Sequence, residues 1–137
     1  MELAWVTSPK LPMRRRPVRP GDLTRHQVIT NPEPSKLITV IRDWFATAGL
    51  EPSRLSACNS LAVIARLTAA GAGVSVLPVS ILGEEFRRGL LIALVAQPAL
   101  APQRLFAGYQ ADQTGPGINA ILRIAREVLA RTHLLAP

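Results

Sequence analysis

Apolar residues along this chain recur with two alternating spacings. Short runs such as Val28–Thr30 are rich in β-branched residues and end at turn formers, which is typical of strands. Between these runs, apolar positions recur every three or four residues, which is the spacing of one helix face. The pattern predicts strands at Leu3–Thr7, Val28–Thr30, Arg54–Cys58, Gly73–Leu77, Leu90–Val95 and Leu105–Gln110. It predicts helices at Leu37–Ala48, Leu61–Thr68, Val79–Arg88 and Ile118–Leu129.

Capping residues mark where these helices begin and end. Ser35 is expected to cap the first long helix, and Gly49 follows its last turn. Asn59 or Ser60 is expected to cap the next helix, which ends at Gly71. Because strands alternate with helices across short turns, the sequence predicts an α/β fold with a mostly parallel sheet flanked by helices.

The composition bounds the possible functions. The chain has 137 residues, 48% of them hydrophobic, which is enough for about one domain with a buried core. Sixteen basic against nine acidic residues give a net charge of +7, and a basic cluster, Arg14–Arg16 with Arg19, suggests phosphate contacts. No aromatic residues alternate with this cluster and no helix-turn-helix pattern follows it. A solvated arginine-rich loop is therefore the favoured interpretation.

Catalytic and metal-binding residues are sparse. One cysteine, Cys58, and two distant histidines, His26 and His133, do not form a metal-binding pattern, and no Gly-x-Ser-x-Gly motif is present. We therefore expect no enzyme activity, no catalytic or metal site, and no cofactor. The longest uncharged run, Leu67–Gly83, is broken by glycines and a proline, so no membrane segment is expected. With a single cysteine and no secretory signal, the sequence predicts a cytoplasmic protein.

Polar residues follow three of the predicted strands. Ligands of open α/β sheets bind beyond the carboxyl ends of strands, where helices begin with free backbone N–H groups. Hydroxyl and amide groups at these ends would suit a carboxylate or another small polar ligand, although capping alone also explains each of them. The candidate binding residues are Thr30, Asn31, Ser35, Asn59, Ser60 and Pro78.

Several segments, in order, match the pattern of one protein family. Cys58–Leu61 and then Arg66–Pro78, with its Gly-x-Gly turn and its Leu-Pro end, resemble the effector-binding domain of LysR-type transcriptional regulators. Leu3–Pro9, Arg19–Leu23 and Arg42–Pro52 resemble further segments of that domain. Lys10-Leu11-Pro12 departs from the family pattern, because no histidine precedes the proline.

The resemblance implies a type 2 periplasmic-binding-protein-like fold with a small-molecule effector, such as a small organic acid, between two subdomains. Residues 8–102 would form the second subdomain. Residues 1–7 and 103–137 would supply hinge strands and the carboxyl-terminal helix of the first, which would be incomplete. Among the candidate residues, Asn59 and Ser60 are favoured, because the polar effector contacts of the family fall at that helix start.

The helix-turn-helix and linker helix of LysR-type regulators have no counterpart in this sequence. The chain is therefore expected to be the carboxyl-terminal part of a truncated regulator, which would contact DNA only through the absent element. Without its partner strands, the last strand and helix would expose apolar surface and favour self-association. The alternatives are a free-standing solute-binding protein of the same fold, which would need an export signal, and a small basic nucleic-acid-binding protein.

Overall fold

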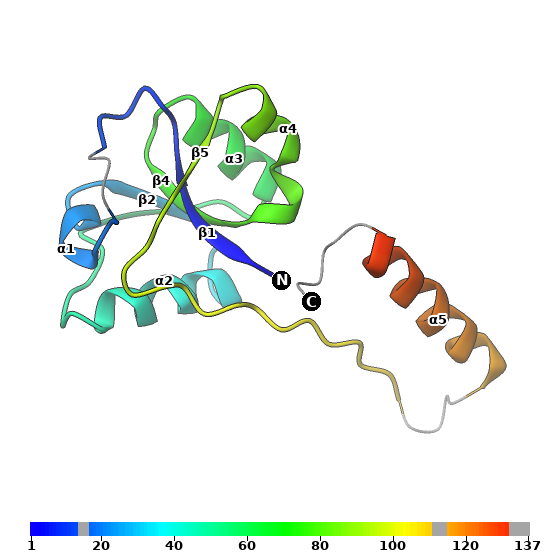
Figure 1. Cartoon of the computed structure of the whole chain (residues 1–137). Coiled ribbons are helices and arrows are strands. Elements are labelled where there is room, and N and C mark those ends of the chain that lie inside the picture. Colours follow the sequence, from blue (N-terminus) through cyan, green and yellow to red (C-terminus); the bar gives the residue numbers. More distant parts are fainter. Residues whose placement is uncertain (14–16, 111–114, 132–137) are drawn as a thin grey trace.

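A five-stranded sheet forms the centre of the molecule, with the strands in the order β3-β2-β4-β1-β5. The computed structural model describes residues 1–13, 17–110 and 115–131 (Figure 1). The strands are β1 (Leu3–Thr7), β2 (Gln27–Thr30), β3 (Arg54–Ala57), β4 (Val74–Pro78) and β5 (Ile92–Leu94). Each of these five strands overlaps a run that the apolar pattern predicts.

Strand directions confirm the expected α/β sheet. β2 runs parallel to β3 and to β4, whereas β1 lies between β4 and β5 and is antiparallel to both. Four strands therefore run in one direction and β1 alone runs in the other. β1 is hydrogen-bonded into the same sheet as the rest, and the division into subdomains at residues 8–102 stays a prediction.

Helices cover both faces of the sheet (Figure 1). Residues of α2 pack with Trp5 and Val28 in one apolar cluster, and residues of α3 pack with Val6 and Ile29 in another. Because neighbouring residues of a strand point to opposite faces, the two helices cover opposite sides. The helices are α1 (Pro20–Leu23), α2 (Lys36–Ala46), α3 (Leu61–Ala69), the 3-10 turn Val79–Ile81, α4 (Gly83–Arg87) and α5 (Pro116–Arg131).

Three aromatic rings join the sheet to α2. Trp5 of β1 is fully buried, and its ring centroid lies 5.1 Å from that of Trp44 and 6.0 Å from that of Phe45. Trp44 and Phe45 pack edge to face at 5.3 Å. The Trp44 indole N–H also donates a hydrogen bond to the Pro98 carbonyl at 2.7 Å. The same cluster thus fixes β1, α2 and the chain that follows β5.

The turn from α3 into β4 depends on its two glycines for its backbone conformation and its packing. Gly71 ends the helix with a φ of +90°, which an L side chain rarely adopts. A Cβ at Gly73 would lie 2.2 Å from the backbone oxygen of Gln27, so the backbone at these two positions is too close for any side chain at Gly73. Glycine at this position is therefore a requirement of the packing between β4 and β2.

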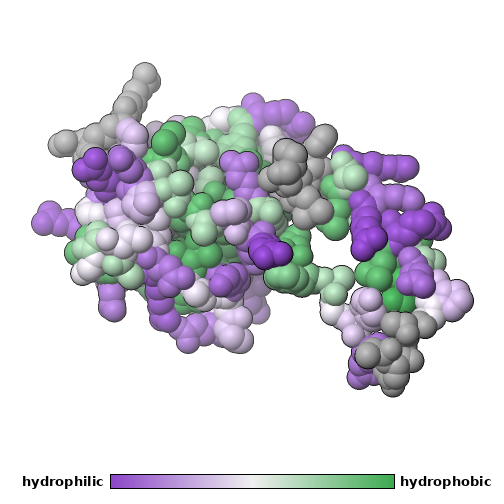
Figure 2. Space-filling model, turned by 60° about the horizontal axis from the view of Figure 1, so that its bottom comes forward, coloured by the Kyte–Doolittle hydropathy of each residue, from purple (hydrophilic) through white to green (hydrophobic). Residues whose placement is uncertain are grey.

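The predicted strand Leu105–Gln110 is wrong: these residues form no regular secondary structure. A strand needs a hydrogen-bonded neighbour, and the last such pairing here is between Gln103 and Met1, whose N–H and carbonyl groups bond reciprocally at 2.9 and 3.0 Å. The helix α5 forms as predicted but buries no residue. Figures 1 and 2 show α5 set apart from the sheet, with apolar surface on that side of the molecule.

Some expectations fall on residues that the structure does not describe. Arg14–Arg16, the centre of the predicted basic cluster, and His133 lie outside the described residues. Within the described residues, no helix is long and apolar enough to cross a membrane.

Replacement of Gly73 by alanine tests the close approach of β4 and β2. We expect Gly73→Ala to lower the free energy of unfolding by about 2 kcal/mol or more, because the new Cβ must displace backbone rather than a flexible side chain. Urea unfolding followed by circular dichroism measures this loss. Gly83→Ala is the matched control, because a Cβ there meets nothing within 4 Å, and its change should stay within about 0.5 kcal/mol. Equal effects of the two substitutions would contradict the packing argument.

Candidate ligand site at the strand ends

The carboxyl ends of β2, β3 and β4 lie at one edge of the sheet, because the three strands are parallel. The chain leaving β2 passes through α2 to β3, on one side of β2. The chain leaving β4 passes to β5, on the other side. Adjacent strands whose connections diverge leave a crevice between their ends, which is where ligands bind in open α/β sheets. In this sheet the topology therefore predicts a ligand crevice between the ends of β2 and β4.

Hydrogen bonds tie together the segments that follow β2 and β3. Thr30 is opposite Ala57 in the parallel register, and the Cys58 N–H donates to the Thr30 carbonyl at 2.8 Å. The Asn31 side-chain amide donates to the Cys58 carbonyl at 3.0 Å. These bonds place Thr30 and Asn31 beside the segment that carries Asn59 and Ser60.

Two helices begin at this edge, one on each face of the sheet. Ser35 caps α2, where its hydroxyl oxygen accepts a hydrogen bond from the Leu37 N–H at 3.2 Å. Ser60 caps α3 by accepting from the Val63 N–H at 3.4 Å. Both serines act as caps, as predicted, and Ser60 rather than Asn59 fills that role in α3. Each serine keeps its O–H free to donate elsewhere, since capping uses only the oxygen as an acceptor.

The remaining polar candidates differ in how available they are. The side chain of Asn59 is exposed and makes no hydrogen bond to any described residue, so both its donor and its acceptor groups are open to a ligand. Thr30 is only 1% exposed, and its Oγ1 is buried without a hydrogen-bond partner among the described residues. Leaving a buried hydroxyl without a partner costs about 1–3 kcal/mol, and among the described residues Trp5 Nε1 and Thr7 Oγ1 are buried without partners as well.

Pro78 lies at the end of β4, on the other side of the predicted crevice from Thr30. It ends β4, is buried and pairs with Leu3 of β1. Since Val28 pairs with Val74, Thr30 is level with Val76, and Pro78 extends two residues further along the sheet edge. Pro78 has neither a polar side chain nor an N–H, so it can contribute only an apolar wall and its carbonyl.

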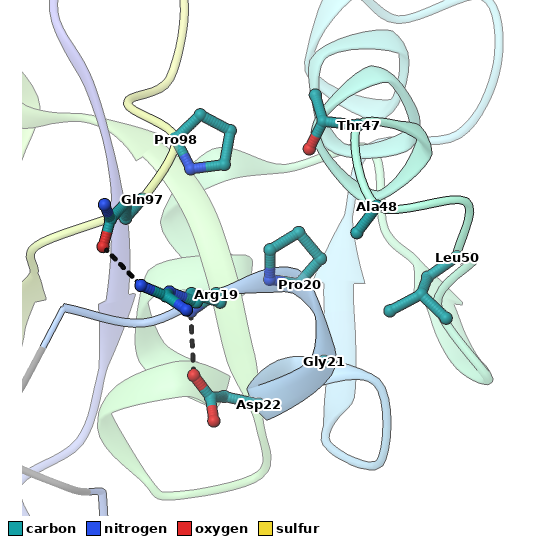
Figure 3. A pocket seen from close by; sticks show the side chains of 9 residues that line it. All are labelled: Arg19, Pro20, Gly21, Asp22, Thr47, Ala48, Leu50, Gln97 and Pro98. Atoms are coloured by element: carbon teal, nitrogen blue, oxygen red, sulfur yellow. Dashed lines mark hydrogen bonds between the residues drawn. The ribbon is translucent and has the colours of Figure 1, made fainter.

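A second pocket lies at the other end of α2, where the sequence predicts no site (Figure 3). The Arg19 backbone N–H donates to the Asp22 carboxylate at 2.9 Å, and the Arg19 guanidinium donates to the Gln97 side-chain oxygen at 3.3 Å. Asp22 thereby caps the short helix α1, as its place in the sequence suggests. The wall of this pocket comes from Pro20, Thr47, Leu50 and Pro98, whose separation in sequence hides the pocket from motif analysis.

Metal-binding and nucleophilic side chains are sparse among the described residues. These residues contain no group of three or more histidine, cysteine or acidic side chains that could bind a metal ion. In the described part of the chain, the thiol of Cys58 lies 3.9 Å from the Ser60 carbonyl and has no histidine partner. The strand-end edge presents amide, hydroxyl and backbone N–H groups, which can form hydrogen bonds to a polar ligand.

The sequence and the fold of this chain are similar to those of one family of regulatory domains. A family model described as the LysR substrate binding domain matches residues 1–130. No curated protein matches the chain. Among solved structures, the regulatory domain of MetR, a LysR family regulator from Neisseria meningitidis, is similar with a TM-score of 0.79 and 19% identity, over 96% of this chain and 61% of that one.

Two further similar structures contain small molecules. The regulatory domain of CcmR from Synechocystis PCC6803, in complex with 2-PG, has a TM-score of 0.70 and 18% identity, over 93% of this chain and 62% of that one. The effector-binding domain of BenM with its effector benzoate has a TM-score of 0.61 and 20% identity, over 99% and 63%. The chain spans less than two thirds of each of these three domains. Because the family model covers nearly the whole sequence and these structures share its fold, the chain belongs to the LysR substrate-binding-domain family.

Proposed function

We propose that this chain is an effector-sensing module of a LysR-type transcriptional regulator and that it binds a small organic acid at the crevice between β2 and β4. Asn59 and Ser60 would contact the ligand directly, and Thr30, Asn31, Ser35 and Pro78 would form the rest of this wall. The proposal is supported by membership of the family and by the benzoate and 2-PG complexes of the similar domains. We place this function in the cytoplasm, without an enzymatic step.

The open side chain of Asn59 carries the proposal. It stands at the start of α3, next to a serine whose O–H remains free, and helix starts favour negative charge. An acid group at this position would accept hydrogen bonds from the Asn59 amide, the Ser60 hydroxyl and the first N–H groups of α3. The neutral hydrogen-bonding groups would select the ligand by shape and by its acceptor atoms.

Effector binding would reach DNA only through the rest of such a regulator. A ligand shifts a conformational equilibrium by the difference between its affinities for the two states. If a second wall also held the ligand, contacts from both walls would favour one orientation of the two walls relative to each other. The orientation would then set the state of a helix-turn-helix carried by another part of the regulator.

The variant Asn59→Ala tests the binding site. We expect thermal-shift measurements with benzoate and other small carboxylic acids to identify an acid that stabilises the chain. Asn59→Ala should weaken the affinity for that acid about tenfold, because one hydrogen bond to a charged group is lost. Ser60→Ala should weaken it as well and should also destabilise α3 through the lost cap.

Asn119→Ala is the matched control, since Asn119 is an exposed asparagine on α5, remote from the strand ends. It should leave the affinity unchanged. Unchanged affinity in Asn59→Ala and Ser60→Ala alike would exclude this edge as the effector site.

Self-association is the second part of the proposal. Ile121 and Ile124 of α5 are 66% and 51% exposed, and exposed apolar stripes of this kind favour contacts with another chain. We expect the chain to show a mass above that of a monomer, rising with concentration, in light scattering coupled to size exclusion. The double variant Ile121→Ser/Ile124→Ser should move the mass towards the monomer value of 14.8 kDa. A concentration-independent monomer for the unmodified chain would contradict this part of the proposal.

A further inference from the structure

A groove runs between α2 and the segment that follows β5. Residues 98–106 form a strap that runs along α2 in the direction opposite to that of the helix (Figure 1). The hydrogen bond from the Trp44 indole to the Pro98 carbonyl fixes the strap near the carboxyl end of α2. Between strap and helix lies a cavity of about 680 Å³, large enough for a small organic ligand.

The floor and walls of this groove are largely apolar. Val40 and Trp44 form the floor from the buried face of α2, and Leu100 lines the strap side. Phe106 adds an aromatic ring that is 80% exposed to solvent. A ligand with an apolar body would remove this ring from water, which is the main source of affinity in such sites.

The charges along the groove are unevenly placed. Lys36 stands at the first turn of α2, and Arg104 lies near the end of the strap that has run back towards that turn. Neither cation forms an ion pair with a described carboxylate, and the Arg104 guanidinium lies 5.3 Å from the centre of the Phe106 ring. Asp43 lies seven residues along α2 from Lys36, about 10 Å away by the helix rise. One end of the groove is therefore basic and open to an anion.

We propose that this groove is a second small-molecule site, which binds amphipathic carboxylates with the acid group between Lys36 and Arg104. The apolar body of the ligand extends over Val40, Leu100 and Phe106 towards Trp44. The site is separate from the crevice at the strand ends, because it lies on the α2 face and takes most of its lining from the strap. It goes beyond the effector site of the proposed function and does not depend on it.

Charge complementarity favours a small anion over other occupants of the groove. A second copy of this chain carries a net charge of +7 and would bring further positive charge to Lys36 and Arg104. The described residues of α5 include three arginines and one glutamate, so that helix is also basic. A carboxylate with an apolar body satisfies both the two cations and the exposed ring.

Occupation of the groove has a structural consequence. Gln103 of the strap bonds reciprocally with Met1, and Pro98 is held by Trp44. A ligand between these two anchor points would hold the strap against α2 and fix the direction in which the chain continues towards α5.

The test uses 2-naphthoate as the probe and equilibrium dialysis of the full chain as the measurement. We expect saturable binding that weakens with added salt, and weaker binding of the uncharged 2-naphthalenemethanol. Lys36→Gln and Arg104→Gln should each weaken naphthoate binding about three- to fivefold, as the loss of an exposed ion pair does. Phe106→Ala should weaken the binding of both compounds, because it removes the apolar wall.

Matched controls and a spectroscopic readout locate the bound probe. Lys10→Gln removes the same charge outside the groove and should leave naphthoate binding unchanged. The chain has two tryptophans, so its ¹⁵N spectrum has two indole signals. The Trp44 signal should move on binding, because its N–H bonds the strap.

Three outcomes would overturn the proposal. The first is full binding to the double variant Lys36→Gln/Arg104→Gln with no movement of the Trp44 signal. The second is loss of naphthoate binding on replacement of Ile121 and Ile124 by serine, which would assign the probe to the apolar stripe of α5. The third is movement of the Trp44 signal with protein concentration alone, which would assign the groove to a second copy of the chain.

Discussion

The packing of Trp5 against Trp44 and Phe45 holds the parts of this molecule together. Trp5 belongs to β1, the one strand that runs against the others, and its two aromatic partners belong to α2. Because Trp44 also bonds Pro98, the position of the strap depends on the same cluster. The start of α2, with Ser35 and Lys36, is fixed by how these rings pack. Both the crevice and the groove therefore rely on a helix that the aromatic cluster anchors to the sheet.

The two sites differ in their chemistry, although both lie beside α2. The crevice offers neutral hydrogen-bonding groups, Asn59 and Ser60, at a helix start that favours negative charge. The groove offers two cations and an apolar wall. A small acid fits the first site and an acid with a large apolar body fits the second. A ligand in the first site would contact the wall formed by the sheet, whereas a ligand in the second site would contact the strap that leads to α5.

Local pattern was enough to predict most of the fold and the serine caps of α2 and α3. Ser35 and Gly49 bracket α2, and the Gly73–Leu77 run enters the sheet through the tight turn that its glycines suggest. The strand predicted at Leu105–Gln110 does not form. The residue pattern shows that a segment suits a strand, but it does not show whether a neighbouring strand is there to pair with it. The groove escaped prediction because Lys36 and Arg104 come to line one cavity only after α2 and the strap have packed. Whether Asn59 contacts an effector is beyond what pattern can decide, since capping and binding favour the same residue types.

A residue-by-residue map of ligand contacts tests the central claim most directly. Backbone ¹⁵N–¹H spectra recorded while benzoate is added report which amides sense the acid. We expect the largest shifts at residues 30–35, 58–62 and 78–80, which surround the proposed crevice between β2 and β4. Saturable shifts confined to α5 and the strap, with these three segments unmoved, would contradict the assignment of the strand ends as the effector site.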